Sequence, residues 1–182
     1  MQPVSGFNFH VYFSPPAPES NALDAGDTLA AATGIASGTV NSANGVGFAE
    51  VHGINSEMEV EEYREGGRNI GARRFPKWGR YPNLVLRRGI TDSTFLWDWW
   101  ADVMSHSFTL ATTNAPPRRN GVILLENTSH NTVAGWFFAN AMPERLTGPG
   151  LNARSSEIAI ETLELAHEGL LRLPASNLPA TV

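Results

Sequence analysis

The residues that decide the fold lie between 84 and 103 and read LVLRRGITDSTFLWDWWADV. Residues 81–88, which include the first part of this stretch, have the alternating pattern of a short, half-buried β-strand. Their second part predicts an amphipathic α-helix that Thr91 or Asp92 caps. Because the wide aromatic face of such a helix must be covered, we expect the helix to lie on a sheet or over the mouth of a barrel.

The predicted helix has one apolar stripe and one polar side. Asp98 and Asp102 lie opposite the stripe, and Trp97 falls outside it. We therefore expect Trp99 and Trp100 to pack inward, which leaves Trp97 for a contact between subunits. The stripe consists of Phe95, Leu96, Trp99, Trp100 and Val103.

Period-two patterns predict further strands on both sides of this stretch. In the last of them Ile158 and Ile160 lie on even positions, whereas Leu163 and Leu165 lie on odd ones. A regular strand cannot bury both sets, so we predict a β-bulge or sharp twist near Glu161-Thr162. With residues 81–88 the predicted strands number about seven. The others are residues 7–13, 46–52, 57–63, 121–127, 132–142 and 157–173.

The composition excludes several classes of protein. The 182 residues include no cysteine, which excludes disulfide frameworks, thiolate metal sites and cysteine nucleophiles. No apolar run is long enough for a membrane-spanning helix, and the N-terminus lacks a signal-peptide pattern. We therefore expect assembly in the cytoplasm and no insertion into a membrane. Residues 14–45, filled with small and polar side chains, predict a loop insertion.

Charge is distributed unevenly along the chain. Residues 64–88 hold eight basic residues and one acidic residue, a balance of +7, and the other five basic and seventeen acidic residues give −12, for a net charge of −5. One interpretation pairs Glu57, Glu59 and Glu61 with arginines of a neighbouring strand. In another, acidic and basic patches meet between copies of the chain. A third, nucleic-acid binding, is disfavoured by the acidic total charge.

The motifs of catalysis and metal binding are absent. The five histidines lack the spacing of a metal site. There is no phosphate-binding glycine loop and no Gly-x-Ser-x-Gly nucleophile motif. Glu57, Glu59 and Glu61 share one strand face, without the contrasting environments that acid–base catalysis needs. We therefore predict no catalytic residue, no cofactor and no metal.

Several motifs together resemble a known family. The first is VGFAEVHGI at residues 46–54, which leads into EYREGGRN at 62–69, and the second is LVLRRGITD at 84–92, which runs into LWDW at 96–99. Later motifs are NAMP at 140–143 and SEIAIETLELAHEGL at 156–170. In this order they resemble the tail tube proteins of contractile phage tails and of phage-tail-like contractile injection systems. With the first strand, the resemblance covers nearly the whole chain.

The resemblance implies a mainly β (α+β) fold, an antiparallel two-sheet β-barrel or sandwich with one flanking amphipathic helix, in a single domain over residues 1–182. It implies a structural, non-enzymatic subunit of the inner tube. Six copies would close into a hexameric ring, and stacked rings would form a hollow conduit that is driven into the target when the sheath contracts. The implied partners are further copies, sheath, baseplate and tape-measure proteins, and cargo protein or DNA in the lumen. The implied location is a phage tail or an injection particle.

The resemblance also points to interface residues. Residues 62–67 and a loop from 68 to 78 match the part of the family that reaches toward a neighbouring subunit or ring, and Gly66 and Gly67 suit its turn. The predicted interface residues are Glu57, Glu59, Glu61, Tyr63, Arg64, Glu65, Arg68, Arg73, Arg74, Trp78 and Trp97.

The chain departs from the family in the length of residues 14–45, because relatives usually join these strands by something much shorter. The insertion could decorate the tube, contact the sheath or baseplate, or mark a specialised end ring. Two other functions fit the residues. One is a single-ring tube and cargo chaperone of the type VI secretion kind, and the other is a β-barrel whose open, apolar interior binds a small ligand.

Overall fold

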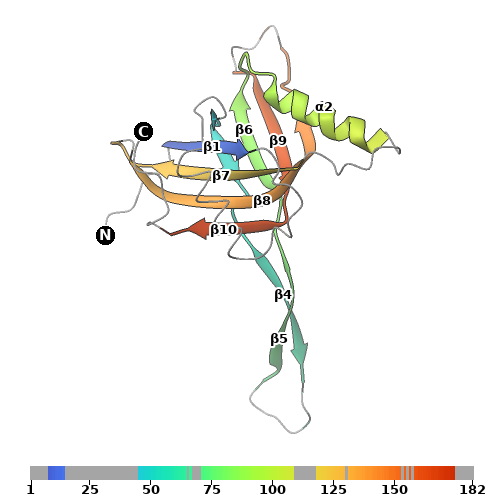
Figure 1. Ribbon diagram of the computed structural model, residues 1–182. Helices are drawn as coiled ribbons and strands as arrows, with labels where there is room; N and C mark the ends of the chain where they lie inside the picture. The colour runs from blue at the N-terminus through green and yellow to red at the C-terminus, as the bar shows by residue number, and fades with distance from the viewer. Residues whose placement is uncertain are drawn as a thin grey trace.

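The computed structural model describes residues 8–14, 45–64, 66, 71–108, 118–129, 131–152, 154, 156 and 158–174. In this part of the chain, ten strands and one helix form a body from which a hairpin projects (Figure 1). The elements are β1 (Asn8–Ser14), β2 (Gly45–Val46), β3 (Glu50–His52), β4 (Glu57–Tyr63), β5 (Arg73–Arg80), β6 (Leu84–Gly89), α2 (Phe95–Phe108), β7 (Arg119–Glu126), β8 (Thr132–Thr147), β9 (Ile160–Ala166) and β10 (Gly169–Leu173).

Two antiparallel sheets make the body, and the long strand β8 belongs to both. The strand order is β2-β1-β7-β8-β9-β6-β3, and β10 pairs with β8 as well. β7 and β10 flank the first part of β8, whereas β9 pairs with its last part. This confirms a mainly β, antiparallel two-sheet fold. The predicted insertion at residues 14–45 falls between β1 and β2, and its residues 15–44 lie outside the described part.

β8 passes from one sheet to the other at Asn140. This residue has a φ of 50°, and the pairing of β7 with β8 shifts register between Arg119 and Gly121. Asn120 accepts the backbone N–H of Asn140 at 2.8 Å, and the side chain of Asn140 donates to Glu168 at 3.0 Å. Asparagine tolerates the left-handed conformation that such a bulge requires. The bulge therefore redirects β8 into the second sheet.

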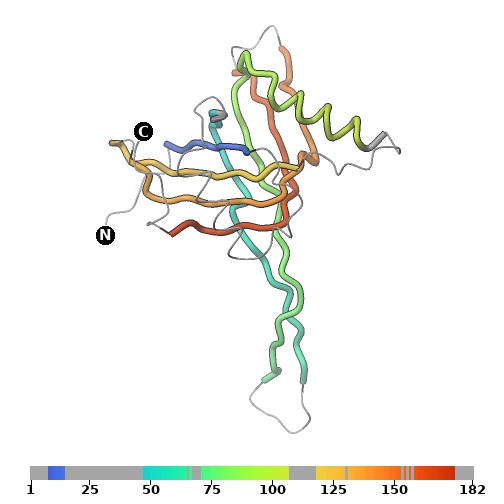
Figure 2. The backbone as a smooth tube through the Cα atoms, in the orientation of Figure 1, coloured from blue at the N-terminus to red at the C-terminus, as the bar shows by residue number. Residues whose placement is uncertain are grey.

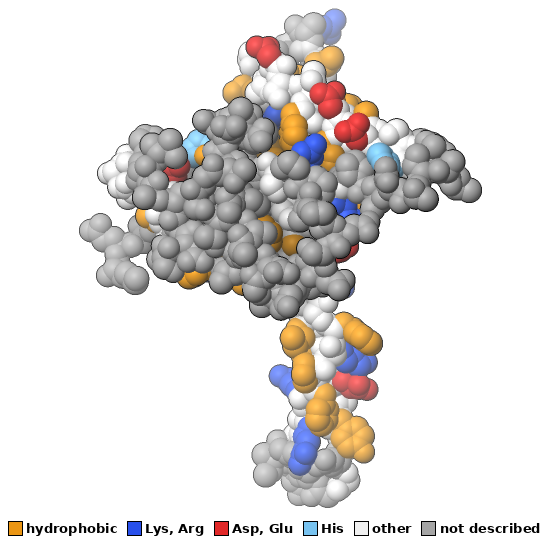
Figure 3. Space-filling view, viewed as in Figure 1, with side chains coloured by type: hydrophobic (Ala, Val, Ile, Leu, Met, Phe, Trp, Pro, Cys, Tyr) orange, Lys and Arg blue, Asp and Glu red, His pale blue; other side chains and the backbone are white. Residues whose placement is uncertain are grey.

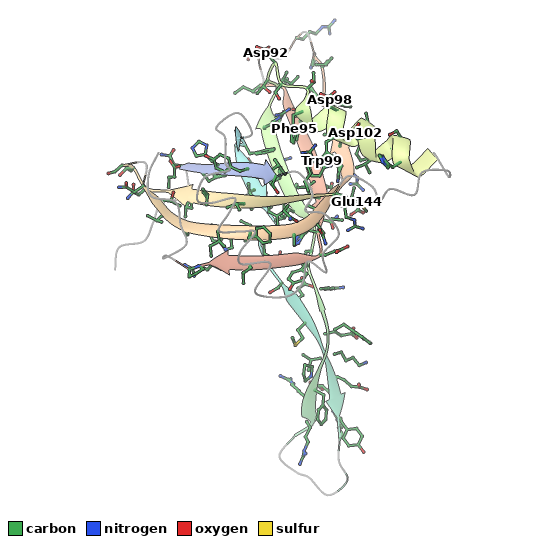
Figure 4. All side chains as sticks on the ribbon, in the orientation of Figure 1. Asp92, Phe95, Asp98, Trp99, Asp102 and Glu144 are labelled. Carbon is green, nitrogen blue, oxygen red and sulfur yellow. The ribbon has the colours of Figure 1, made fainter. Side chains whose placement is uncertain are left out.

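The core fills the space between the two sheets and α2. The ring of Phe13 lies 5.5 to 5.9 Å from the rings of Phe95, Trp99 and Phe138. Figure 4 shows Phe95 and Trp99 reaching from α2 toward the sheets, and Asp98 and Asp102 of the same helix are exposed. The predicted stripe is confirmed at Leu96, Trp99 and Val103, which are buried, while Phe95 and Trp100 are half-buried.

Several predicted boundaries are wrong. The strand predicted at 132–142 continues to Thr147 as β8, and the one predicted at 81–88 begins at Leu84 as β6. The helix starts at Phe95 and not beside Thr91 or Asp92, because the first helical hydrogen bond runs from the Asp98 amide to the Thr94 carbonyl at 2.9 Å. Residues 46–52 form two short strands, of which β2 pairs with β1 and β3 with β6. Residues 157–173 likewise form β9 and β10, which pair with different parts of β8.

The predicted bulge near Glu161-Thr162 is also wrong. β6 and β9 pair without a register shift from Leu84 opposite Leu165 to Gly89 opposite Ile160. Glu161 itself takes an inward position in line with the buried leucines of β9, because Arg88 pairs with it there. Ile158 and Ile160 lie on the outward face and are exposed.

Candidate assembly interface

The hairpin of β4 and β5 projects from the body as a two-stranded sheet of its own (Figures 1 and 2). Every residue of both strands is exposed. Eight residues of β5 span about 25 Å at the usual strand rise. Since an isolated two-stranded hairpin is marginal in water, an arm of this length requires support from something outside the chain's own core.

The two strands pair with one irregularity near the middle. Met58 lies opposite Gly79 and Val60 opposite Pro76, so Lys77 and Trp78 of β5 together face one residue of β4. This is a β-bulge, which turns side chains out of the regular alternation and increases the local twist. Trp78 is 75% exposed at this point, the largest apolar side chain on the arm.

Cross-strand ion pairs hold the strands in register. Arg80 donates to Glu57 at 2.9 Å, Arg74 donates to Glu62 at 3.0 Å, and Lys77 lies 3.5 Å from Glu61. The predicted pairing with an arginine is therefore confirmed for Glu57, whereas Glu61 pairs with a lysine. Glu59 makes no ion pair with any residue in the described part of the chain. Exposed pairs of this kind contribute up to about 1 kcal/mol each, so they set register more than they supply stability.

Both faces of the hairpin expose apolar side chains. Met58, Val60 and Pro76 share one face, since Val60 and Pro76 are opposite each other and Met58 is two residues from Val60. Tyr63 and Phe75 lie on the other face. Figure 3 shows these hydrophobic side chains interleaved with charged ones along the arm. Exposed apolar side chains on both sides, mixed with charged ones, give each face of the arm the composition of a contact surface.

A shallow hollow lies at the bulge. It is lined by Glu57, Met58, Glu59, Trp78 and Arg80. Charged side chains and the exposed indole of Trp78 therefore line this hollow.

Most of the sequence-predicted interface residues come together on this arm. β4 carries Glu57, Glu59, Glu61 and Tyr63, and Arg64 follows it directly. Glu65 and Arg68 lie outside the described residues. The loop predicted from 68 to 78 is wrong over its second part, because β5 begins at Arg73 and carries the predicted residues Arg73, Arg74 and Trp78.

Trp97 lies elsewhere, on α2. Its indole N–H donates to the buried Glu161 at 3.0 Å, while the side chain remains partly exposed. Trp97 therefore has a structural contact in addition to any contact between subunits.

Sequence reasoning missed Met58, Val60 and Phe75. The alternation of β4 contained the signal for Met58 and Val60, because it places them opposite the glutamate ladder. The strand β5 was not predicted because it contains Pro76 and Gly79, and both residue types are rare inside strands.

The described residues offer no metal cluster and no spanning helix. Within them, no three His, Asp or Glu side chains are grouped so that they could hold a metal ion. No helix in the described part is long and apolar enough to cross a membrane.

Comparison with solved structures identifies the fold. A chain in the cryo-EM structure of the anti-feeding prophage (AFP) baseplate has a TM-score of 0.70 and 24% identity, over 95% of this chain and 97% of that chain. A chain in the sheath–tube complex of PVC, an extracellular contractile injection system, has a TM-score of 0.66 and 22% identity, over 95% and 93%. A chain in the structure of the PVC sheath/tube terminator also has a TM-score of 0.66 and 22% identity, over 96% of this chain and 99% of that chain.

Sequence comparison identifies the family. No curated protein matches the chain. The family profile described as T4-like virus tail tube protein gp19 matches residues 6–171, which is most of the chain. The chain therefore belongs to the tail tube protein family.

Proposed function

We propose that six copies of this structural tube subunit close into a ring, and that such rings stack into the hollow inner tube of a contractile tail or injection system. The observation that carries the proposal is the hairpin of β4 and β5. It exposes apolar side chains on both faces, and among the described strands β4 and β5 pair only with each other. A second copy provides that support without any further protein.

The physics of assembly fits this proposal. A contact between two different surfaces of identical chains generates a ring when the rotation closes and an open filament when it does not. Among the strands that the structure describes, β10 pairs with β8 alone, and its other edge is the one we propose for a neighbour in the ring. The number six is supported by the AFP baseplate structure, which is described as six-fold symmetrised.

The proposed interface residues are those of the hairpin and Trp97. We propose that Glu57, Glu59, Glu61, Tyr63, Arg64, Arg73, Arg74 and Trp78 contact a neighbouring subunit, and Glu65 and Arg68 belong to the same proposal from sequence alone. Paired charges along the arm favour one register of docking over others.

The proposed partners are the proteins of such a particle. The PVC and AFP structures contain sheath, tube and baseplate components, which supports sheath and baseplate contacts for this chain. We also propose a tape-measure protein and a cargo, protein or DNA, within the lumen. The work of the subunit is mechanical and not enzymatic, with assembly in the cytoplasm before incorporation into the particle.

The interior of the body argues against the small-ligand alternative. The space between the sheets is filled by Phe13, Phe95, Trp99 and Phe138, which contact one another in the core. A ligand-binding barrel would need this space open.

Electron microscopy and sedimentation of the purified chain test the proposal. We expect six-fold rings or tubes for the natural chain and their loss in Met58→Asp/Val60→Asp, whose substitutions lie on one exposed face of the arm. The matched control is Met104→Asp, an exposed apolar residue of α2. Persistent monomers of the natural chain at high concentration, or intact tubes of the double variant, would contradict the proposal.

A further inference from the structure

We propose that the base of the hairpin is a hinge, which His167 holds closed while its ring is neutral and releases when its ring is protonated. The hinge consists of residues 53–56, which join β3 to β4, and residues 81–83, which join β5 to β6. We term these two segments the root. The inference goes beyond the proposed function, because it concerns the position of the hairpin within a single chain.

The two segments of the root meet at one point. Gly53 has a φ of 86°, and a methyl group placed on it would lie 2.1 Å from the backbone oxygen of Asn83. Glycine allows both this conformation and so close an approach of the two backbones. Neither segment belongs to a strand, and beyond them β4 and β5 form a sheet of their own (Figure 2). A few loop residues between two such parts are the usual place for a hinge.

His167 ties the second segment of the root to the body. It lies in the turn between β9 and β10, and its side chain is half-buried. Its Nε2 is 3.1 Å from the carbonyl oxygen of Pro82, and its Nδ1 is 3.0 Å from that of Gly169. Its ring also packs against the ring of Tyr81, with 5.6 Å between the ring centres. One side chain thus bridges the root of the hairpin and the first residue of β10.

The charged groups around the root have partners of their own. Arg80, at the end of β5, pairs with Glu57 across the hairpin. The side chain of Asn83 donates to Glu144 of β8. The titratable and charged groups on the segments next to His167 and the root are His52, Arg80, Tyr81, Glu144 and Glu168. His52 lies 3.5 Å from Glu50, and Glu168 pairs with Arg118. The contact between the root and the turn therefore depends mainly on the ring of His167.

Protonation of this ring favours the open root. A neutral imidazole has one N–H and can donate to one of the two carbonyls, whereas an imidazolium would donate to both. Burial of the ring outweighs this gain and lowers the pKa of His167 from 6.5. In an open root the ring is in water, where its pKa returns to about 6.5. The open root therefore binds the proton first, so opening becomes more favourable as the pH falls below about 6.5.

Opening of the root changes the direction in which the hairpin presents its apolar faces. The hairpin itself is unaffected, because its cross-strand ion pairs lie outside the root. We therefore expect assembly of the chain to be sensitive to acid, and this consequence alone rests on the proposed function.

Pulsed electron paramagnetic resonance tests the hinge, because the natural chain contains no cysteine and two spin labels can be placed at chosen positions. Glu59→Cys places one label on the hairpin and Ala101→Cys places the other on α2, at two exposed positions. An excess of unlabelled natural chain restricts the measured distances to those within one chain. We expect a narrow distance distribution at pH 7.5 and a broader one at pH 5.5. The ratio of open to closed chains should rise several-fold, with a limit of about tenfold for a single group that titrates at 6.5 when open.

Two histidine variants assign the pH dependence. His167→Gln should give the same distribution at both pH values, because glutamine does not titrate. The matched control is His52→Gln, which removes an exposed histidine directly before the root and should behave like the natural chain. A natural chain with equal distributions at the two pH values would overturn the inference, as would a pH dependence that persists in His167→Gln.

A glycine variant opens the root without acid. Gly53→Ala pushes the two segments apart and should broaden the distribution already at pH 7.5. Gly71→Ala is the matched control, because Gly71 also has a positive φ, 99°, but a methyl group there meets nothing within 4 Å. A narrow distribution in Gly53→Ala would overturn the hinge, and if this variant does not fold, the histidine comparison decides. Failure of the natural chain to form rings would refute the proposed function and leave the distance measurement valid.

Discussion

Arg88 and Glu161 form an ion pair in the interior of the body, where their side chains are only 2% and 5% exposed. They lie opposite each other on β6 and β9. Arg88 also donates to the carbonyl of Ser93 at 3.1 Å, and Glu161 accepts the indole N–H of Trp97 at 3.0 Å. The pair thus joins two strands to the start of α2 through one further hydrogen bond from each residue.

Glu161→Leu should destabilise the fold by about 3–5 kcal/mol, because it leaves the Arg88 guanidinium buried without a counter-charge. Urea unfolding followed by tryptophan fluorescence measures this loss. The double variant Arg88→Met/Glu161→Leu should recover most of it, since two apolar side chains replace the buried pair. If Glu161→Leu is as stable as the natural chain, the prediction fails, because water would then solvate the Arg88 guanidinium in the variant.

Gly121→Ala should cost about 1–3 kcal/mol through overpacking. A methyl group on Gly121 would lie 2.2 Å from Cζ of Phe138, which is fully buried and cannot withdraw. Gly47→Ala is the matched control, because a methyl group there meets nothing within 4 Å. Thermal unfolding of both variants gives the comparison, and an unchanged midpoint for Gly121→Ala would contradict the packing around Phe138.

The stability of the fold should decrease as the pH falls below about 6.5, because burial lowers the pKa of His167 from that value. Its two ring nitrogens face the carbonyls of Gly169 and Pro82 at 3.0 and 3.1 Å, which partly offsets the effect of burial. A lowered pKa in the folded state means that the unfolded chain binds the proton first, so protonation favours unfolding. Unfolding midpoints between pH 7.5 and 5 should fall less in His167→Gln than in the natural chain. Equal slopes would exclude His167 as the source.

Arg80→Glu should loosen the hairpin without unfolding the body, because it sets two carboxylates against each other at the Glu57 position. We expect faster backbone amide exchange in β4 and β5, and a global unfolding midpoint close to that of the natural chain. The charge-swapped variant Glu57→Arg/Arg80→Glu should restore slow exchange. Unchanged exchange in Arg80→Glu would mean that this ion pair does not set the register.

The parts of the fold that bury one face were predictable from the sequence. In β1 the residues Val11 and Phe13 are buried on alternate positions, and in α2 the stripe of Leu96, Trp99 and Val103 is buried as predicted. When an element buries one side, its apolar residues recur every two residues in a strand or about every 3.6 residues in a helix. This pattern can be recognised from the sequence alone.

The exceptions arise where a polar residue lies inside or an apolar residue lies outside. Glu161 occupies an inward position that the pattern assigned to an apolar residue, and this produced the false bulge. β5 has no buried residue at all, so no period marks it. Both features depend on long-range partners, Arg88 in one case and a proposed neighbouring chain in the other, which a local pattern does not contain.

The sequence indicated which segment carries the candidate site, but it did not indicate the exposed apolar residues of that segment. Charge and family resemblance pointed to the segment of Tyr63 and Arg74, whereas Met58 and Val60 were overlooked beside the more conspicuous glutamates. Apolar residues at alternate positions of a strand ordinarily indicate a core, and here they are exposed.

The sharing of β8 between the two sheets has a mechanical consequence. Its 16 residues bond to β7 and β10 before the turn at Asn140 and to β9 after it. A load that pulls one sheet away from the other therefore acts on the covalent backbone of β8 as well as on its interstrand hydrogen bonds. Under the axial load that the proposed function implies, we expect the two halves of the subunit to move together and any deformation to occur at the joints between copies.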